Sequence, residues 1–205
     1  MNIMLKRPGQ NSPQNMLDKF GVIELIHFER FCRDNLQWEE MKKCFATHST
    51  VSVSWFQGTG QEFVEASKKM KAYIPHKLYN TEVWLHNNKA VAITMATISA
   101  RMNLNGHLVE LQSDVKLLYR TQQIDGLMYV VSMEGIYEKD ALVPVTPNAD
   151  ISVPADEIAK FRSSYANLAY FSMIEGNKVS QELPGMDKPE MVNKLYQEAD
   201  EWLNI

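Results

Sequence analysis

His76 is the residue whose type and position most invite chemistry. It follows Pro75 in the stretch KAYIPHKLYN at residues 71–80, where a helix-like segment meets an apolar, strand-like run. An imidazole titrates near neutral pH, so at this junction it is either an ordinary turn residue or a base held at the mouth of a pocket. The other histidines are scattered without ligand spacing, so no metal site is expected: His27, His48, His86 and His107.

Composition and charge exclude several classes of protein. The chain has 205 residues, which suits one domain with or without an appendage, and 45% of them are apolar, enough for a sizeable core. Its 21 Lys and Arg against 25 Asp and Glu give a net charge of -4, so neither nucleic acid nor an anionic membrane is an expected partner. No apolar run approaches the roughly 20 residues that span a bilayer.

The N-terminus and the cysteines indicate the cytoplasm. The opening MNIMLKRPGQNSPQNM has no apolar stretch or cleavage site of a signal peptide, and we interpret it as a loose leader. Cys32 and Cys44 form neither a disulfide framework nor a metal-ligand pair. There is no P-loop and no G-x-S-x-G elbow, and the GTG at 58–60 lacks the third glycine of a dinucleotide fingerprint, so no cofactor is expected.

The first half of the chain predicts three helices and a strand. Apolar residues at three- and four-residue intervals indicate a helix from Phe20, and its face comprises Val22, Leu25, Ile26, Phe28 and Cys32. Asp34-Asn35 ends that helix, and Asn35 can cap a second one that carries Trp38, Met41 and Phe45. The alternation in TVSVSWF predicts a half-buried strand with Trp55 on its apolar side.

A turn at GTG should then lead into the third helix. Thr59 and Glu62 form a capping-box pattern at its start. The helix carries Phe63, Met70 and Ile74 on one face and must end before Pro75.

Three hairpin signals predict a four-stranded meander after His76. Asn87-Asn88, Asn105-Gly106 and Asp125-Gly126 each separate two strand-like runs, and the last two pairs are strong turn sequences. Strands of this length should form a strongly twisted or curved sheet.

Two amphipathic helices are expected near the C-terminus. The first follows Pro154, stops near Gly176, and has an apolar face of Ile158, Phe161, Tyr165 and Leu168. Asp187 and Glu190 should open the second, whose face is Val192, Leu195, Ala199 and Trp202.

This order predicts an α+β fold, a cone-shaped, mostly antiparallel curved sheet with helices across its open side and a cavity for a small molecule. We divide the chain into a leader (1–17), a main domain (18–145) and a C-terminal helical extension packed on that domain (146–205).

The order and certain motifs resemble the SnoaL-like, scytalone-dehydratase-like members of the nuclear transport factor 2-like superfamily. Three segments of residues 18–145 carry the resemblance: RDNLQWEEMKKCFATHSTVSVSW, EFVEASKKMKAYIPHKLYN and IDGLMYVVSMEGIYEKDALVPV. In the dehydratase and dehydrochlorinase branches an Asp at the end of the first helix pairs with a His after the third. The resemblance thus implies Asp34 and His76 as a catalytic dyad, although an Asp-Asn pair at a helix junction is also ordinary capping chemistry.

The sequence departs from those branches at other site positions. Glu29 stands where they often carry a tyrosine, and the arginine that the dehydrochlorinase type has on its last strand has no clear counterpart. The acid that would assist a leaving group is unassigned among four candidates: Tyr79, Tyr119, Tyr129 and Tyr137. Tyr79, Tyr119 and Tyr137, with Trp55, are also expected to bind substrate. Asp114 shares a strand face with polar residues and should be solvated unless a bulge reverses the register.

We expect a small-molecule lyase or isomerase, dehydratase- or dehydrohalogenase-like, that acts without a cofactor on an apolar or ring-containing molecule. A binding protein or polyketide-cyclase-like protein with the same cavity is the alternative, and a partner-binding module on the open sheet face is the third. The resemblance to this family and the polar sheet face suggest a homodimer or homotrimer, with contacts from the sheet or the C-terminal helices.

Overall fold

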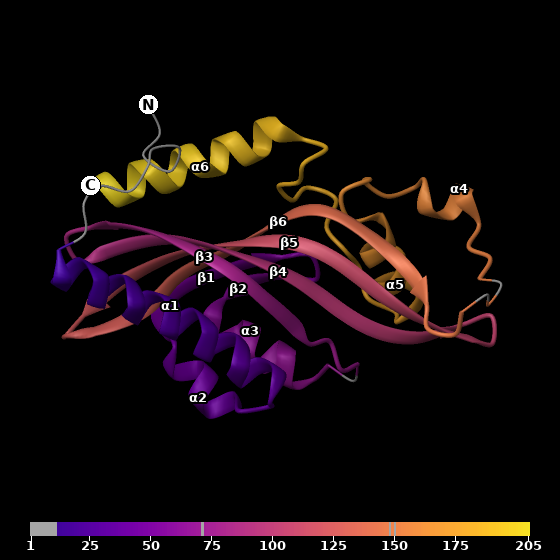
Figure 1. The fold of residues 1–205 in the computed structure, drawn as a ribbon, viewed down its shortest axis with the longest axis horizontal. Coiled ribbons are helices and arrows are strands. Elements are labelled where there is room, and N and C mark those ends of the chain that lie inside the picture. Colours follow the sequence, from indigo (N-terminus) through magenta and orange to yellow (C-terminus); the bar gives the residue numbers. More distant parts are fainter. Residues whose placement is uncertain (1–11, 71, 148, 150) are drawn as a thin grey trace.

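One curved six-stranded sheet organises the molecule, with strand order β2-β1-β6-β5-β4-β3 (Figure 1). The computed structural model describes residues 12–70, 72–147, 149 and 151–205. Neighbouring strands are antiparallel except β1 and β6, which are parallel. The strands are β1 (Phe45–Val53), β2 (Phe56–Thr59), β3 (His76–His86), β4 (Lys89–Leu104), β5 (His107–Ile124) and β6 (Leu127–Pro144). The α+β class expected from the sequence is therefore confirmed.

The three predicted hairpins join β3 to β4, β4 to β5 and β5 to β6, as expected. Each turn begins with a residue in the left-handed region, at φ 54° for Asn87, 52° for Asn105 and 50° for Asp125. Gly106 and Gly126 follow with φ of 83° and 85°. Two consecutive residues with positive φ give the turn twist that matches a pair of antiparallel strands.

Helices cover both faces of the sheet. They are α1 (Pro13–Asp34), α2 (Trp38–Lys43), α3 (Gly60–Lys68), α4 (Ala155–Ile158), α5 (Ala166–Ile174) and α6 (Pro189–Asn204). In Figure 1, α1, α2 and α3 lie on one side, α6 lies on the other, and α4 and α5 lie towards the far end. Within the described residues, none of these helices has both the length and the hydropathy to cross a membrane.

The N-terminal helix starts earlier than the predicted leader boundary. Residues 1–11 of that leader lie outside the described residues. Pro13–Leu17 already belong to α1, and the Ser12 hydroxyl accepts the Asn15 N–H as its cap. The expected cap at Asn35 is wrong, because Asn35 ends α1 and Gln37 precedes α2 without a side-chain cap.

The strand predicted around Trp55 is interrupted. Ser54 and Trp55 form a turn that pairs Val53 of β1 with Phe56 of β2, so Trp55 is not on the apolar side of a strand. The turn predicted at 58–60 is also wrong, since Gly58 is in β2 and Gly60 opens α3. The capping box is confirmed: the Thr59 hydroxyl accepts the Glu62 N–H, and the Glu62 carboxylate accepts the Thr59 N–H.

The single helix expected between Pro154 and Gly176 is broken in two. Its middle contains Arg162, which donates hydrogen bonds to the Asp187 carboxylate and to the Gln181 carbonyl, at 3.0 and 3.2 Å. These long-range bonds hold the segment between α4 and α5 out of a helix. They also occupy Asp187, which therefore does not cap α6; Lys188 precedes that helix without a side-chain cap.

Two hydrophobic clusters hold the layers together. The large one joins the inner sheet face to α1, α3 and α5, with Ile26, Phe63 and Phe171 among its buried members. The small one lies between the outer sheet face and α6, and consists of Val91, Leu118, Ile136, Val192, Leu195, Ala199 and Leu203.

Truncation of Leu118 should test how firmly α6 is docked. Leu118 is fully buried under α6, so Leu118→Ala should lower the free energy of unfolding by about 2–5 kcal/mol in urea denaturation. Leu108→Ala, the same change on the same strand at a side chain that is 42% exposed, is the control and should cost less than about 0.5 kcal/mol. Equal costs for both variants would show that α6 is not packed on this face.

Candidate active site

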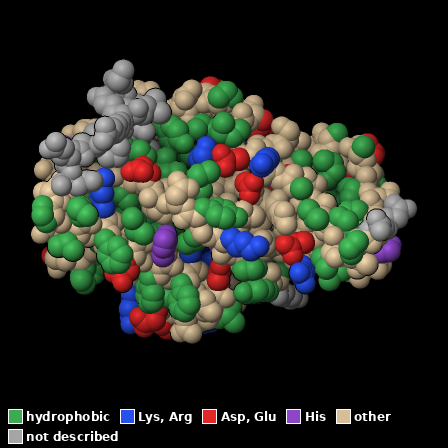
Figure 2. Space-filling view, in the orientation of Figure 1, with side chains coloured by type: hydrophobic (Ala, Val, Ile, Leu, Met, Phe, Trp, Pro, Cys, Tyr) green, Lys and Arg blue, Asp and Glu red, His purple; other side chains and the backbone are tan. Residues whose placement is uncertain are grey.

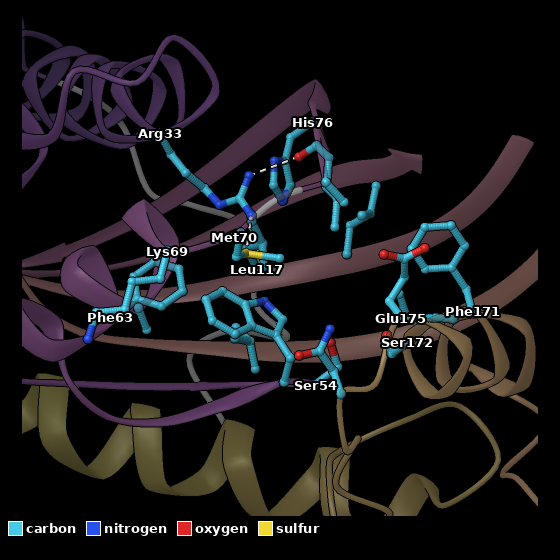
Figure 3. Close-up of a pocket in the computed structure, with 18 of the residues that line it drawn as sticks. Arg33, Ser54, Phe63, Lys69, Met70, His76, Leu117, Phe171, Ser172 and Glu175 are labelled. Carbon is cyan, nitrogen blue, oxygen red and sulfur yellow. Dashed lines mark hydrogen bonds between the residues drawn. The ribbon is translucent and has the colours of Figure 1, made fainter. Parts of the chain in front are cut away.

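A cavity of about 340 Å³ lies between the inner sheet face, α1, α3 and α5 (Figure 3). Its walls are largely apolar and include Val53, Trp55, Phe63, Ile74, Ile98, Leu117, Leu168 and Phe171. Its polar lining consists of Arg30, Arg33, Ser54, Lys69, His76, Tyr137, Ser172, Glu175 and Asn177. A small number of polar groups in an apolar enclosure is typical of a small-molecule site.

Asp34 and His76 are in direct contact at the edge of this cavity. Asp34 ends α1 and His76 begins β3, and their side chains are 12% and 7% exposed. The Asp34 carboxylate accepts two hydrogen bonds from His76, one from ring Nδ1 at 3.0 Å and one from the backbone N–H at 2.6 Å. The hydrogen bond assigns the imidazole proton to Nδ1, which leaves Nε2 as the nitrogen that can accept a proton.

The surroundings keep His76 neutral and Asp34 ionised. Burial lowers the pKa of His76 to about 4; the Asp34 hydrogen bond opposes this shift, and the charges of Arg33 and Arg30 add to it. Burial disfavours the Asp34 carboxylate, but the hydrogen bonds from His76 and the charge of Arg33 lower its pKa below the ordinary value. At neutral pH, His76 is therefore an unprotonated imidazole oriented by a carboxylate.

Two buried arginines of α1 also line the cavity. Arg33 donates to the Asp34 carboxylate at 3.1 Å and to the Ile74 carbonyl at 2.8 Å. Arg30 is 3% exposed and donates to both oxygens of Glu29, which is itself fully buried. The Phe63 ring lies 5.6 Å from the Arg30 guanidinium, within cation–π distance.

The spacing of these arginines in the sequence indicates that they are buried, although the predicted helix face did not include them. Val22, Ile26, Arg30 and Arg33 are spaced by four, four and three residues, so both arginines continue the buried face of the helix. Charged residues at core-facing positions are rare unless they are paired or functional. The prediction that placed Phe28 on that face is wrong, because its side chain is 44% exposed.

The four tyrosine candidates lie in different places. Tyr137 lines the cavity, and its oxygen accepts the Ser54 N–H at 2.7 Å. Burial raises the pKa of Tyr137 to about 12. Tyr119 is buried behind Glu29, to which its hydroxyl donates at 3.4 Å, so it is not among the cavity residues.

Tyr79 and Tyr129 are likewise absent from the lining. Tyr79 is 57% exposed, and its hydroxyl lies 3.0 Å from Thr97 Oγ1. Of the three tyrosines expected to bind substrate, Tyr137 lies in the lining and Tyr79 and Tyr119 do not, and their contact with a substrate stays a prediction. Trp55 does line the cavity, from the β1–β2 turn. Asp114 is 38% exposed and accepts a hydrogen bond from Thr97 at 2.7 Å, so it lies outside the cavity despite a bulge beside it.

Comparison with known proteins identifies the fold. No family model matches the chain. Pea pathogenicity protein 2 of Fusarium vanettenii is 27% identical over 94% of this chain and 89% of its own length. A hexachlorocyclohexane dehydrochlorinase matches in structure with a TM-score of 0.53 and 10% identity, over 68% of this chain and 95% of its own.

A Novosphingobium aromaticivorans protein assigned as a scytalone dehydratase matches with a TM-score of 0.50 and 13% identity, over 69% of this chain and 95% of its own. These structural matches show the fold, which this chain shares with both proteins and which is the α+β fold expected from the sequence.

The depressed pKa of His76 predicts a specific loss of stability in acid. As pH falls from 6.5, the unfolded chain binds a proton at His76, and the folded chain does not until about pH 4. This contribution is complete above pH 6.5 and is lost towards pH 4, a difference of about 3 kcal/mol in the free energy of unfolding.

The change should be measured by urea denaturation between pH 7 and 4. His76→Asn cannot titrate and serves as the control, because its stability should fall less over the same range. Parallel pH curves for the two proteins would contradict the assigned protonation state.

Proposed function

We propose that this protein is a cofactor-independent lyase or isomerase that acts on a small, largely apolar, ring-containing molecule inside the cavity. The observation that carries the proposal is the neutral His76 imidazole, held by the ionised Asp34 carboxylate at the wall of an apolar enclosure. A group of this kind can remove a proton from carbon and needs no metal or coenzyme to do so.

In the proposed reaction, His76 Nε2 takes a proton from a ring carbon, and Asp34 stabilises the imidazolium that results. The electron pair of the broken C–H bond forms a double bond to the neighbouring carbon. A leaving group departs from that carbon, and a hydroxyl would leave as water after it receives the proton of Tyr137. Return of the proton from His76 to another carbon gives isomerisation instead.

The similar proteins support this class of chemistry. One structural match is named as a dehydrochlorinase and another is assigned as a dehydratase, and both activities are eliminations. At 10% and 13% identity these matches give the fold, so the activity of this chain rests on its own site.

A binding protein, or a polyketide-cyclase-like protein, is the second candidate. It is favoured by the low pKa of His76, about 4, because an imidazole that resists protonation is a weak base. Such a protein would hold the same ligands without turnover.

Replacement of His76 should separate the two candidates. The assay would use a panel of a cyclic β-hydroxy ketone, a halogenated cyclohexane and a β,γ-unsaturated cyclic ketone, with products followed by mass spectrometry. His76→Ala should lower kcat about 100- to 10,000-fold on any compound that is converted, with the circular dichroism spectrum unchanged.

The exposed hairpin residue His107 provides the control, and His107→Ala should be fully active. Activity that survives His76→Ala would refute the mechanism. Tight binding of panel compounds without conversion would favour the binding protein.

We also propose that the chain forms a homodimer or homotrimer through α1. The outward face of α1 exposes Met16, Leu17, Phe20, Phe28 and Phe31 by 44–65% each. Figure 2 shows hydrophobic side chains gathered on the face over α1 and α2. Apolar patches of this kind mark interaction sites in water-exposed proteins. The sheet face predicted for this role is partly covered by α6.

Charge placed on this face should dissociate the oligomer. Phe20→Glu with Phe31→Glu should reduce the mass measured by size-exclusion chromatography with light scattering to that of one chain, because two carboxylates cannot be buried unpaired at an interface. Lys77→Glu, at another exposed position, should leave the mass unchanged. A wild-type chain that is monomeric at high concentration would refute the proposal.

A further inference from the structure

The adjacent residues Glu29 and Arg30 are an unexplained feature of the cavity wall. Their side chains are 0% and 4% exposed, and they form an ion pair inside the molecule. A buried ion pair is often no more stabilising than apolar side chains of similar volume. Fold stability therefore does not account for two full charges at the wall of an apolar cavity.

The pair is arranged so that Arg30 is presented and Glu29 is hidden. Arg30 lines the cavity, whereas Glu29 and Tyr119 do not. Glu29 accepts hydrogen bonds from Nε and Nη2 of Arg30, and the Tyr119 hydroxyl supports the carboxylate from behind. With Phe63 against the guanidinium, its orientation is fixed before any ligand arrives.

This arrangement leaves one donor group of Arg30 unused. Nη1 carries two N–H groups, and the described part of the chain provides no acceptor for them. Because Arg30 lines a largely apolar cavity, an oxygen atom of a ligand would be bound strongly there. Arg33 adds a second guanidinium, whose Nη2 contacts the Met70 sulfur at 3.6 Å.

We propose that Arg30 is an anion-binding group, and that the cavity takes ring compounds that carry an acidic oxygen group, a carboxylate or a phenolate. A guanidinium binds such oxygens through short, charge-assisted hydrogen bonds. Because Glu29 and Phe63 orient it in advance, little ordering is needed when the ligand binds.

This inference deepens the proposed function. Binding of an anion at Arg30 does not depend on the proposed reaction, whereas a role of Arg30 in the reaction does. Arg30 and Arg33 lie close enough to His76 to disfavour its protonation. The same positive charges stabilise an anion that forms on the substrate when His76 removes its proton. The field that weakens the base thus also makes the bound carbon acid stronger, and the two effects offset each other.

A matched pair of probes would test the inference by isothermal titration calorimetry. The probes are 2-naphthoate and its neutral isostere 2-naphthamide. The wild-type protein should bind the carboxylate about 10- to 100-fold more tightly than the amide, as expected for a charge-assisted hydrogen bond.

The variant should remove both charges together, because Arg30→Met alone would leave Glu29 buried and unpaired. Glu29→Gln with Arg30→Met should abolish the preference for the carboxylate and keep the affinity for the amide. Glu110→Gln with Arg101→Met removes an exposed pair on the outer sheet face, at 3.1 Å, and is the matched control that should keep the preference.

The outcomes separate this inference from the proposed function. If His76→Ala still prefers 2-naphthoate to 2-naphthamide and the wild type converts no panel compound, the anion site is supported and the proposed enzymatic activity is refuted. If the wild type converts a panel compound but does not prefer 2-naphthoate to 2-naphthamide, the anion site is refuted and the proposed enzymatic activity is supported. Failure of 2-naphthoate to bind at millimolar concentration, or a preference that survives in the double variant of Glu29 and Arg30, overturns the inference.

Discussion

The Asp34 carboxylate is the point on which the site depends. It accepts hydrogen bonds from the ring and the backbone N–H of His76 and from the guanidinium of Arg33. One side chain thus connects the end of α1 to the beginning of β3. These elements are separated in sequence by α2, β1, β2 and α3. The backbone bond fixes where β3 begins, and the ring bond fixes which imidazole nitrogen is available. The Asp34 carboxylate thus sets both the start of β3 and the orientation of the imidazole.

The cost of that ion explains why the neighbouring charges are arranged as they are. A carboxylate that is largely removed from water needs partners, and Arg33 and His76 supply them. Arg30 is matched in the same way by Glu29, so each positive charge on the buried face of α1 has a negative one beside it. The cavity therefore has polarised walls without a large net charge, which suits a reaction in which charge is created and removed within one turnover.

Sequence reasoning found the elements whose causes are local. The hairpins at Asn105-Gly106 and Asp125-Gly126 and the capping box at Thr59 follow from backbone preferences of those residues alone. The turn at Ser54-Trp55 was missed because neither residue has a positive φ there, so the turn needs no Gly or Asn that would mark it in the sequence. The break between α4 and α5 was missed because Arg162 is held by groups 19 and 25 residues further along the chain.

In the site, family resemblance pointed to Asp34 and His76, whereas Arg30 could be found only by extending the face of Val22 and Ile26 along the helix.

The two ends of the cavity come from different parts of the chain, and this divides their roles. Figure 3 places Arg33 and His76 on one side, and Phe171, Ser172 and Glu175 across from them. The first group comes from α1 and β3, the second from α5 and the residue that ends it. A molecule that fills the cavity contacts both. In the proposed reaction, α1 and β3 would therefore supply the reacting groups, and the α5 segment would limit the length and polarity of the ligand that reaches them.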